Sequence, residues 1–122
     1  MTDSHVETIS AITLVTTDMA RSTAFYEALG FDTVFGGPDS DFTSLASGAC
    51  FVNVTTRGAH GAPNFWGRVI FYVSDVDGLY RRAVAAGYTP EFSPRDATWG
   101  ERFFHLVDPD GHELSFARPL GT

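Results

Sequence analysis

The chain repeats one pattern of apolar and polar positions. Residues 12–35 and residues 69–92 each contain an apolar run, an Asp, a stretch with helical spacing, and a Gly followed by an aromatic residue. The Asp in each copy, Asp18 or Asp75, is a residue type that caps helix N-termini, and the Gly favours a left-handed C-cap. Each copy therefore predicts a strand, a helix of about three turns and a second strand that begins at the aromatic residue.

Two further apolar stretches follow each copy and have the length of strands. They are residues 42–46 and 50–55 in the first half, and residues 102–107 and 113–117 in the second half. The last two are joined by the sequence Asp-Pro-Asp-Gly at 108–111, a strong turn signal because Pro presets one dihedral and Gly accepts a positive φ. We therefore expect an α+β fold of two βαβββ modules.

A chain of 122 residues has the length of one domain. We place the first module at about residues 8–56, the second at about 66–118, and a Gly- and Ala-rich linker at about 57–65. A loop at residues 93–100 is positioned to cover a site.

The strand expected near residues 66–74 has two unlike faces. Val69 and Phe71 suit packing beneath a helix, whereas Arg68 and Tyr72 belong to a mixed face. A mixed face suits the concave side of a curved sheet, where a ligand binds.

Charge and cysteine content narrow the classes of function. The formal net charge is −7 and the isoelectric point is about 4.8, which argues against nucleic acid or an anionic membrane as a partner. Every basic residue is Arg, so Schiff-base chemistry on Lys is excluded. Cys50 is the only cysteine, which rules out a disulfide within the chain and fits a cytoplasmic location.

The runs ITLVTTDMARSTAFYEALGF, which begins at Ile12, and WGERFFHLVDPDGHELSFARPL, which begins at Trp99, resemble the vicinal oxygen chelate superfamily. That superfamily includes glyoxalase I, extradiol dioxygenases, fosfomycin resistance enzymes and bleomycin resistance proteins. The resemblance covers nearly the whole chain. It implies a cupped sheet around a ligand cavity, with helices on the outside, and a homodimer.

The chemistry of that superfamily usually needs a divalent metal. Carried over by the resemblance, the four ligand positions fall on Ala11, Val52, Arg68 and Ser115. Ala and Val have no donor atom, Arg is a permanent cation and Ser is a poor ligand. We therefore expect no metal and no other cofactor.

Without a metal, the chain is most similar to the bleomycin resistance branch, whose members bind a drug without altering it. The expected ligand is an aromatic or cationic antibiotic or secondary metabolite. The residues expected to contact it are Phe42, Trp66, Arg68, Tyr72, Trp99 and Phe103.

An enzyme of the same superfamily is the alternative. His105 and Glu101 share one face of a regular strand, with Phe103 between them, and together with Tyr72 they are candidates for proton transfer. A lyase or dioxygenase with displaced metal ligands is a second form of this alternative.

Two local expectations remain. Arg68 either meets a ligand carboxylate or pairs internally with Glu101 or Glu113. His112 follows the turn at 108–111 and is expected to be solvated.

Overall fold

The computed structural model describes residue 4 and residues 7–58 and 66–121. Most of the expected linker, at residues 59–65, therefore lies outside the described residues. The first half contains β1 (Ala11–Val15), α1 (Met19–Ala28), β2 (Asp32–Phe35), β3 (Phe42–Ser47) and β4 (Cys50–Thr55). Its strands form a sheet in the order β1-β4-β3-β2, in which β1 and β4 are parallel and the other pairs are antiparallel.

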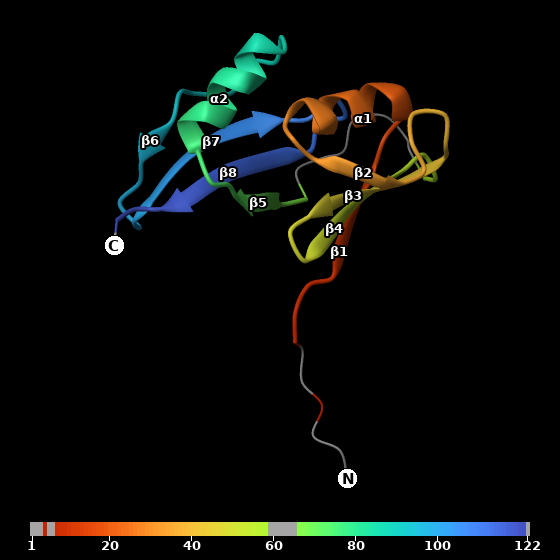
Figure 1. Ribbon diagram of the computed structural model, residues 1–122, viewed down its shortest axis with the longest axis horizontal. Coiled ribbons are helices and arrows are strands. Elements are labelled where there is room, and N and C mark those ends of the chain that lie inside the picture. Colours follow the sequence, from red (N-terminus) through yellow and green to blue (C-terminus); the bar gives the residue numbers. More distant parts are fainter. Residues whose placement is uncertain (1–3, 5–6, 59–65, 122) are drawn as a thin grey trace.

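The second half repeats this arrangement. It contains β5 (Arg68–Tyr72), α2 (Val76–Ala85), β6 (Arg95–Asp96), β7 (Glu101–Val107) and β8 (Glu113–Pro119), with the sheet order β5-β8-β7-β6. Figure 1 shows both helices on the same side of the two sheets. The α+β fold of two βαβββ units is confirmed. Neither helix in the described part of the chain is long and apolar enough to cross a membrane.

The repeated Asp and Gly residues perform the predicted capping. The Asp18 carboxylate accepts a hydrogen bond from the backbone N–H of Arg21, at 3.1 Å, and Asp75 accepts one from Gly78, at 2.9 Å. Beyond the C-caps, Gly30 and Gly87 both have a φ of 96°, a conformation that residues with a Cβ rarely adopt. Both helices therefore begin and end where the sequence pattern places them.

The strand expected to begin at Tyr88 is absent, and this prediction is wrong. Pro90 and Pro94 have no N–H to donate to a sheet ladder. The Glu91 N–H donates one hydrogen bond to the His105 carbonyl oxygen of β7, at 2.9 Å. A ladder with β7 forms only at the two residues of β6 (Arg95–Asp96), which fall inside the expected loop at 93–100.

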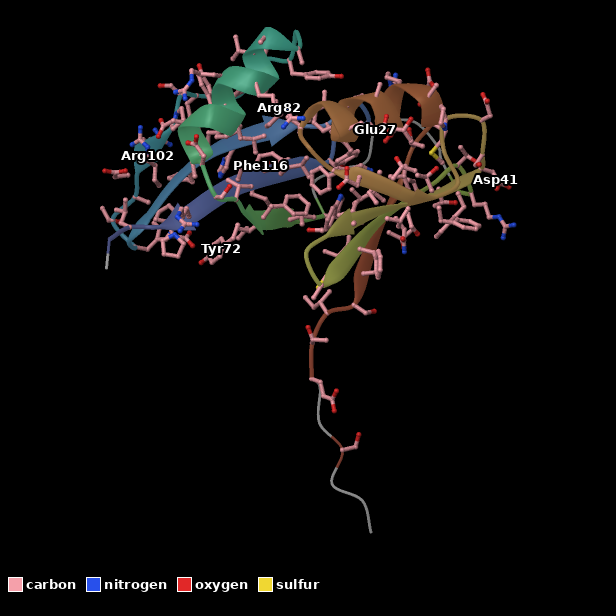
Figure 2. The ribbon with its side chains drawn as sticks, viewed as in Figure 1. Glu27, Asp41, Tyr72, Arg82, Arg102 and Phe116 are labelled. Carbon is pink, nitrogen blue, oxygen red and sulfur yellow. The ribbon has the colours of Figure 1, made fainter. Side chains whose placement is uncertain are left out.

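The hydrophobic core lies between the helices and one face of each sheet. Its fully buried aromatic residues include Phe25 and Tyr26 on α1, Phe104 on β7 and Phe116 on β8. These rings meet mainly at edge-to-face or stacked distances of about 5 Å. The other face of each sheet points away from the helices. Figure 2 shows Tyr72 on that face, whereas Phe116 points toward the helices.

The loop between β7 and β8 joins the second half to the first. Asp110 is buried, and its Oδ1 accepts hydrogen bonds from the Thr17 N–H at 3.0 Å, the Thr17 hydroxyl at 3.3 Å and the Arg21 guanidinium at 2.7 Å. The Tyr26 hydroxyl donates to Asp108 Oδ2 at 2.7 Å. We call Asp108, Asp110 and these partners the cross-brace.

His112 extends this connection and is not solvated, which corrects the sequence prediction. It is 3% exposed, and its Nε2 lies 2.8 Å from the Val15 carbonyl oxygen. Trp66 Nε1 donates to its Nδ1 at 3.0 Å, so Nδ1 is the acceptor and Nε2 is the donor. We expected His112 to be exposed because it directly follows a turn. In the structure, that turn packs against the first half and buries the His112 side chain.

Asp108 makes the stability of this connection depend on pH. Burial raises the pKa of the Asp108 carboxyl, although hydrogen bonds from Tyr26, His112 and Asp110 act in the opposite direction. Because this pKa is higher in the folded than in the unfolded chain, the folded state gains stability as the carboxyl is protonated. It loses that stability as the pH rises through the folded-state pKa.

An Asp108→Asn variant removes the buried charge and keeps a side chain of the same shape. We expect the difference in free energy of unfolding, variant minus wild type, to be most favourable to the variant at about pH 7 and to fall toward about pH 4. Urea denaturation of both proteins across that range measures the difference. A difference that does not change with pH, or that grows as the pH falls, contradicts the raised pKa of Asp108.

Candidate ligand-binding site

The sheet face that points away from α2 carries a pocket of about 220 Å³. The alternation of strand side chains brings residues of β5, β7 and β8 to this face together with the loop before β7. The lining residues are Arg68, Ile70, Trp99, Glu101, Phe103, His105 and Ser115.

Glu101 lies at one end of this pocket between two neutral donors. Its Oε2 accepts a short hydrogen bond from the Tyr72 hydroxyl, and its Oε1 accepts one from Trp99 Nε1 at 3.0 Å. The hydrogen bond to Glu101 raises the pKa of Tyr72, so this phenol is a proton donor and a poor base.

His105 lies at the other end, in an aromatic environment. Its ring centroid is 5.1 Å from those of both Phe92 and Phe103. Burial lowers the pKa of His105, Arg68 lowers it further, and Glu91, 3.9 Å from Nδ1, acts in the opposite direction. The lowered pKa favours the neutral imidazole at neutral pH, which can both donate and accept a hydrogen bond.

Arg68 forms the internal ion pair that was one of its two expected roles. Its Nη2 lies 2.7 Å from Glu113 Oε1, and both side chains are about one-third exposed. The two residues are direct neighbours on the parallel strands β5 and β8.

The six residues expected to contact a ligand do not all meet. Arg68, Trp99 and Phe103 line the pocket, and Tyr72 joins them through Glu101. Phe42 lies on the other sheet, edge-to-face with Phe35. Trp66 lies against His112, so its indole N–H is already used within the protein. The pairing of Trp66 depends on the position of the β7–β8 loop, for which the sequence holds no local signal.

Arg95 lies beside Phe103, one of the pocket-lining residues, and was not predicted from the sequence. Its guanidinium carbon lies 3.8 Å from the ring centroid of Phe92 and 5.6 Å from that of Phe103. A single Arg in a loop between Pro94 and Asp96 gave no pattern from which this stacking was predictable. Arg95 therefore places a positive charge on the faces of Phe92 and Phe103.

One of the four positions implied by the family resemblance was placed wrongly. Val52 is 3% exposed and belongs to the core cluster, so its side chain points away from the concave face. The register pairs Thr13 with Asn53 in the first half, as it pairs Ile70 with Ser115 in the second. Asn53 is therefore the counterpart of Ser115, and the error is one residue, which exchanges the two faces of a strand.

The corrected set of residues does not fit a divalent metal. Ala11 supplies no donor, Arg68 is a cation paired with an acid, and Ser115 and Asn53 supply only neutral oxygens. The amide oxygen of Asn53 also accepts a hydrogen bond from Ser44, at 2.6 Å. Within residue 4 and residues 7–58 and 66–121, no three His, Cys, Asp or Glu side chains are grouped to hold a metal ion.

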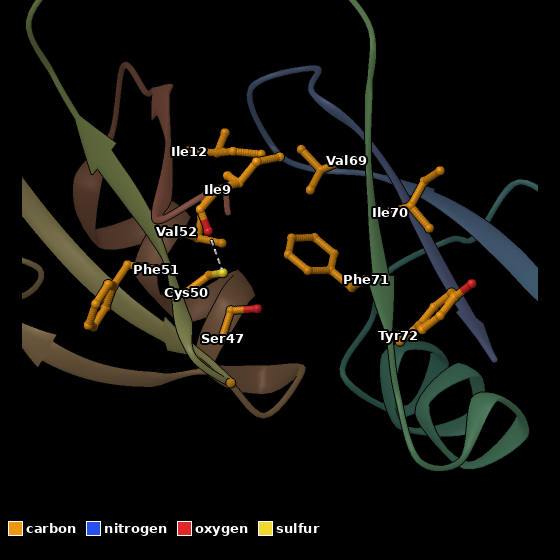
Figure 3. A pocket seen from close by; sticks show the side chains of 11 residues that line it. Ile9, Ile12, Ser47, Cys50, Phe51, Val52, Val69, Ile70, Phe71 and Tyr72 are labelled. Atoms are coloured by element: carbon orange, nitrogen blue, oxygen red, sulfur yellow. Dashed lines mark hydrogen bonds between the residues drawn. The ribbon is translucent and has the colours of Figure 1, made fainter. Parts of the chain in front are cut away.

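A second, larger pocket of about 340 Å³ lies where the two halves meet. Its walls are mostly apolar and come from both halves: Ile9, Ile12, Ser47, Gly48, Cys50, Phe51, Val52, Val69, Ile70, Phe71 and Tyr72. Figure 3 shows Val69 and Phe71 of β5 facing Ile12 and Cys50 across this space. The thiol of Cys50 lies 2.7 Å from the Ile9 carbonyl oxygen. Of the predicted ligand residues, only Tyr72 borders this pocket.

Solved structures with the same arrangement include proteins that bind drugs and proteins named as enzymes. A bleomycin-binding protein in complex with bleomycin is 27% identical, with a TM-score of 0.71 over 93% of this chain and 98% of that one. A lactoylglutathione lyase from Agrobacterium tumefaciens is 20% identical, with a TM-score of 0.73 over 93% of this chain and 94% of that one. At 20% identity, the likeness to the lyase shows only that the two proteins share a fold.

Sequence comparison identifies the family. An uncharacterised protein of Mycobacterium bovis is 40% identical over 48 residues, which are 39% of this chain and 32% of that protein. The model of the Glyoxalase/Bleomycin resistance protein/Dioxygenase superfamily matches residues 8–116. The chain therefore belongs to this superfamily.

Proposed function

We propose that this protein binds and sequesters an aromatic or cationic small molecule, an antibiotic or secondary metabolite, without a metal and without altering it chemically. The observation that carries the proposal is the concave pocket. Its walls are the aromatic residues Trp99 and Phe103 and the acid Glu101, and Arg68 and Ser115 occupy positions where metal-dependent relatives would need ligands. Superfamily membership and the likeness to a bleomycin-binding protein support the ligand class.

We further propose that the protein works as a cytoplasmic homodimer. Phe35, Phe42 and Phe51 of the first half are partly or largely exposed in the single chain, and a second copy that covered them would remove apolar surface from water. Light scattering coupled to gel filtration measures the oligomeric state, and a monomer at micromolar concentration contradicts this part of the proposal.

The binding experiment is a calorimetric titration with bleomycin and with planar aromatic drugs, each in the presence of EDTA, followed by mass spectrometry of the recovered ligand. We expect binding that EDTA does not change, and an intact ligand. An altered ligand contradicts sequestration, and binding abolished by EDTA contradicts the metal-free site.

A Trp99→Ala variant is expected to weaken binding by about tenfold, because an exposed ring that stacks on an aromatic or cationic ligand contributes about 1 kcal/mol or more. The matched control is Val84→Ala, which removes an exposed apolar side chain from α2 on the outer face. The same titration measures both variants. If the two variants bind the ligand with equal affinity, Trp99 does not contact the ligand.

A metal-independent enzyme is the second candidate, favoured by one observation. His105 is a partly buried imidazole with a lowered pKa that lines the same pocket as Glu101. An imidazole in that state suits general-base catalysis at neutral pH. The mass spectrometry described above separates this candidate from sequestration.

A further inference from the structure

The carboxylate of Glu101 is held in place by groups that leave its charge intact. Tyr72 and Trp99 each donate one hydrogen bond to it, and neither donor carries a charge. Asp110, Glu113 and Asp77, by contrast, each lie against an Arg. Glu101 is therefore oriented toward the pocket as an anion by its neighbours.

Aromatic surfaces surround this anion. Trp99 is 67% exposed and Tyr72 is 65% exposed, so both rings are available to a ligand. The Trp99 and Phe103 centroids lie 5.2 Å apart, with the ring planes inclined at 45°. Phe103 itself is 5% exposed and forms a wall.

Ala117 lies between Tyr72 and Phe103 in the sheet. It is paired with Tyr72 on one side and with Phe103 on the other. Adjacent strands lie about 4.8 Å apart, so the two aromatic residues begin about 10 Å apart across a residue with a single methyl group. Ala117 is 1% exposed and Phe103 5% exposed, so the accessible aromatic surface here is that of Tyr72 and Trp99.

The charges around the site determine the direction of approach. Arg95 lies over the Phe92 ring and repels a second cation on that side. Arg68 also lines the pocket and is paired with Glu113. The side of the pocket that offers an anion is therefore the one with Trp99, Tyr72 and the Glu101 carboxylate. An anion bordered by aromatic faces is the arrangement that recognises alkylated ammonium groups, which interact with ring faces and need no further hydrogen bonds.

We propose that Glu101, Tyr72, Trp99 and Phe103 form a cage for the alkylated ammonium group of a tertiary or quaternary amine. The rest of the ligand extends over Phe103 toward His105. This proposal rests on the proposed binding function and adds to it the chemical class of the ligand's charged group.

The test compares two probes of the same shape and different charge. They are 3-hydroxyphenyltrimethylammonium and 3-tert-butylphenol, titrated into the full chain by calorimetry. We expect the cation to bind about tenfold more tightly than its neutral counterpart. Equal affinities for the two probes overturn the cage and leave the proposed binding of aromatic ligands standing. If neither probe binds, the cage is also overturned, and the separate drug titration decides whether the proposed binding function stands.

Two variants separate the cage from the overall acidity of the protein. Glu101→Gln keeps a hydrogen-bond acceptor for Tyr72 or Trp99 and removes the charge, so the preference for the cation is expected to fall to about twofold or less. Glu91→Gln removes the same charge from an exposed side chain near His105 and is expected to leave the preference unchanged. Equal losses in both variants overturn the cage, because the preference would then follow net charge alone.

Discussion

Replacement of Asp110 by alanine is expected to lower the free energy of unfolding by about 2–4 kcal/mol, because a buried acceptor with three donors is lost. The carboxylate holds the N–H and the hydroxyl of Thr17 and forms an ion pair with Arg21. Arg21 is partly exposed and regains water when its partner is removed, which keeps the loss below that of a fully buried pair.

Thermal denaturation measures this effect, and a chain of this length is expected to lose about 10 °C in Tm. The matched control is Asp39→Ala, which makes the same change at an exposed loop position. Its free energy of unfolding is expected to change by less than about 0.5 kcal/mol. If the two variants have the same Tm, the cross-brace does not stabilise the fold.

Replacement of Phe104 by alanine is expected to cost about 3–5 kcal/mol, the range for a large aromatic side chain removed from a closed core. Phe104 is fully buried, stacks on Phe116 at 5.4 Å and meets Tyr80 of α2 edge-to-face at 5.6 Å. Its ring therefore joins α2 to the centre of the second sheet, and no neighbouring side chain replaces both contacts.

Urea denaturation of Phe104→Ala measures this loss, with Phe35→Ala as the control. Phe35 is exposed near the end of β2 and contacts Phe42 at the protein surface. Its removal is expected to cost less than about 1 kcal/mol. A comparable loss in the control means that the exposed aromatic cluster is as important to the fold as the core.

Features governed by neighbouring residues were predictable from the sequence. Asp18 and Asp75 cap their helices because an N-cap needs only a side-chain acceptor and the next turn of backbone. The placement of Glu101, Phe103 and His105 on one face followed from the alternation of a regular strand. The ion pair of Arg68 with Glu113 was one of two pairings considered.

Features that depend on how distant segments meet were not predictable. His112 is buried because its loop packs against the first half, and nothing beside it in the chain signals that contact. Val52 was misplaced because aligning the two halves by their turn glycines ignores how β4 pairs with β1 and β8 with β5, where Phe51 and Glu113 are the counterparts. Phe42 and Trp66 have the composition of ligand-binding residues, but the structure places them outside the concave pocket.

The difference in length between those two turns has a spatial consequence. Ser47 pairs with Cys50 across a tight hairpin, whereas Val107 pairs with Glu113 across a loop of five residues, long enough to bring Asp110 to the start of α1. Ser47 and Gly48 of the shorter hairpin line the apolar pocket between the halves, which Tyr72 of β5 also borders. The longer loop thus ties the second half to the first by hydrogen bonds, whereas the shorter hairpin contributes to the wall of the gap between them.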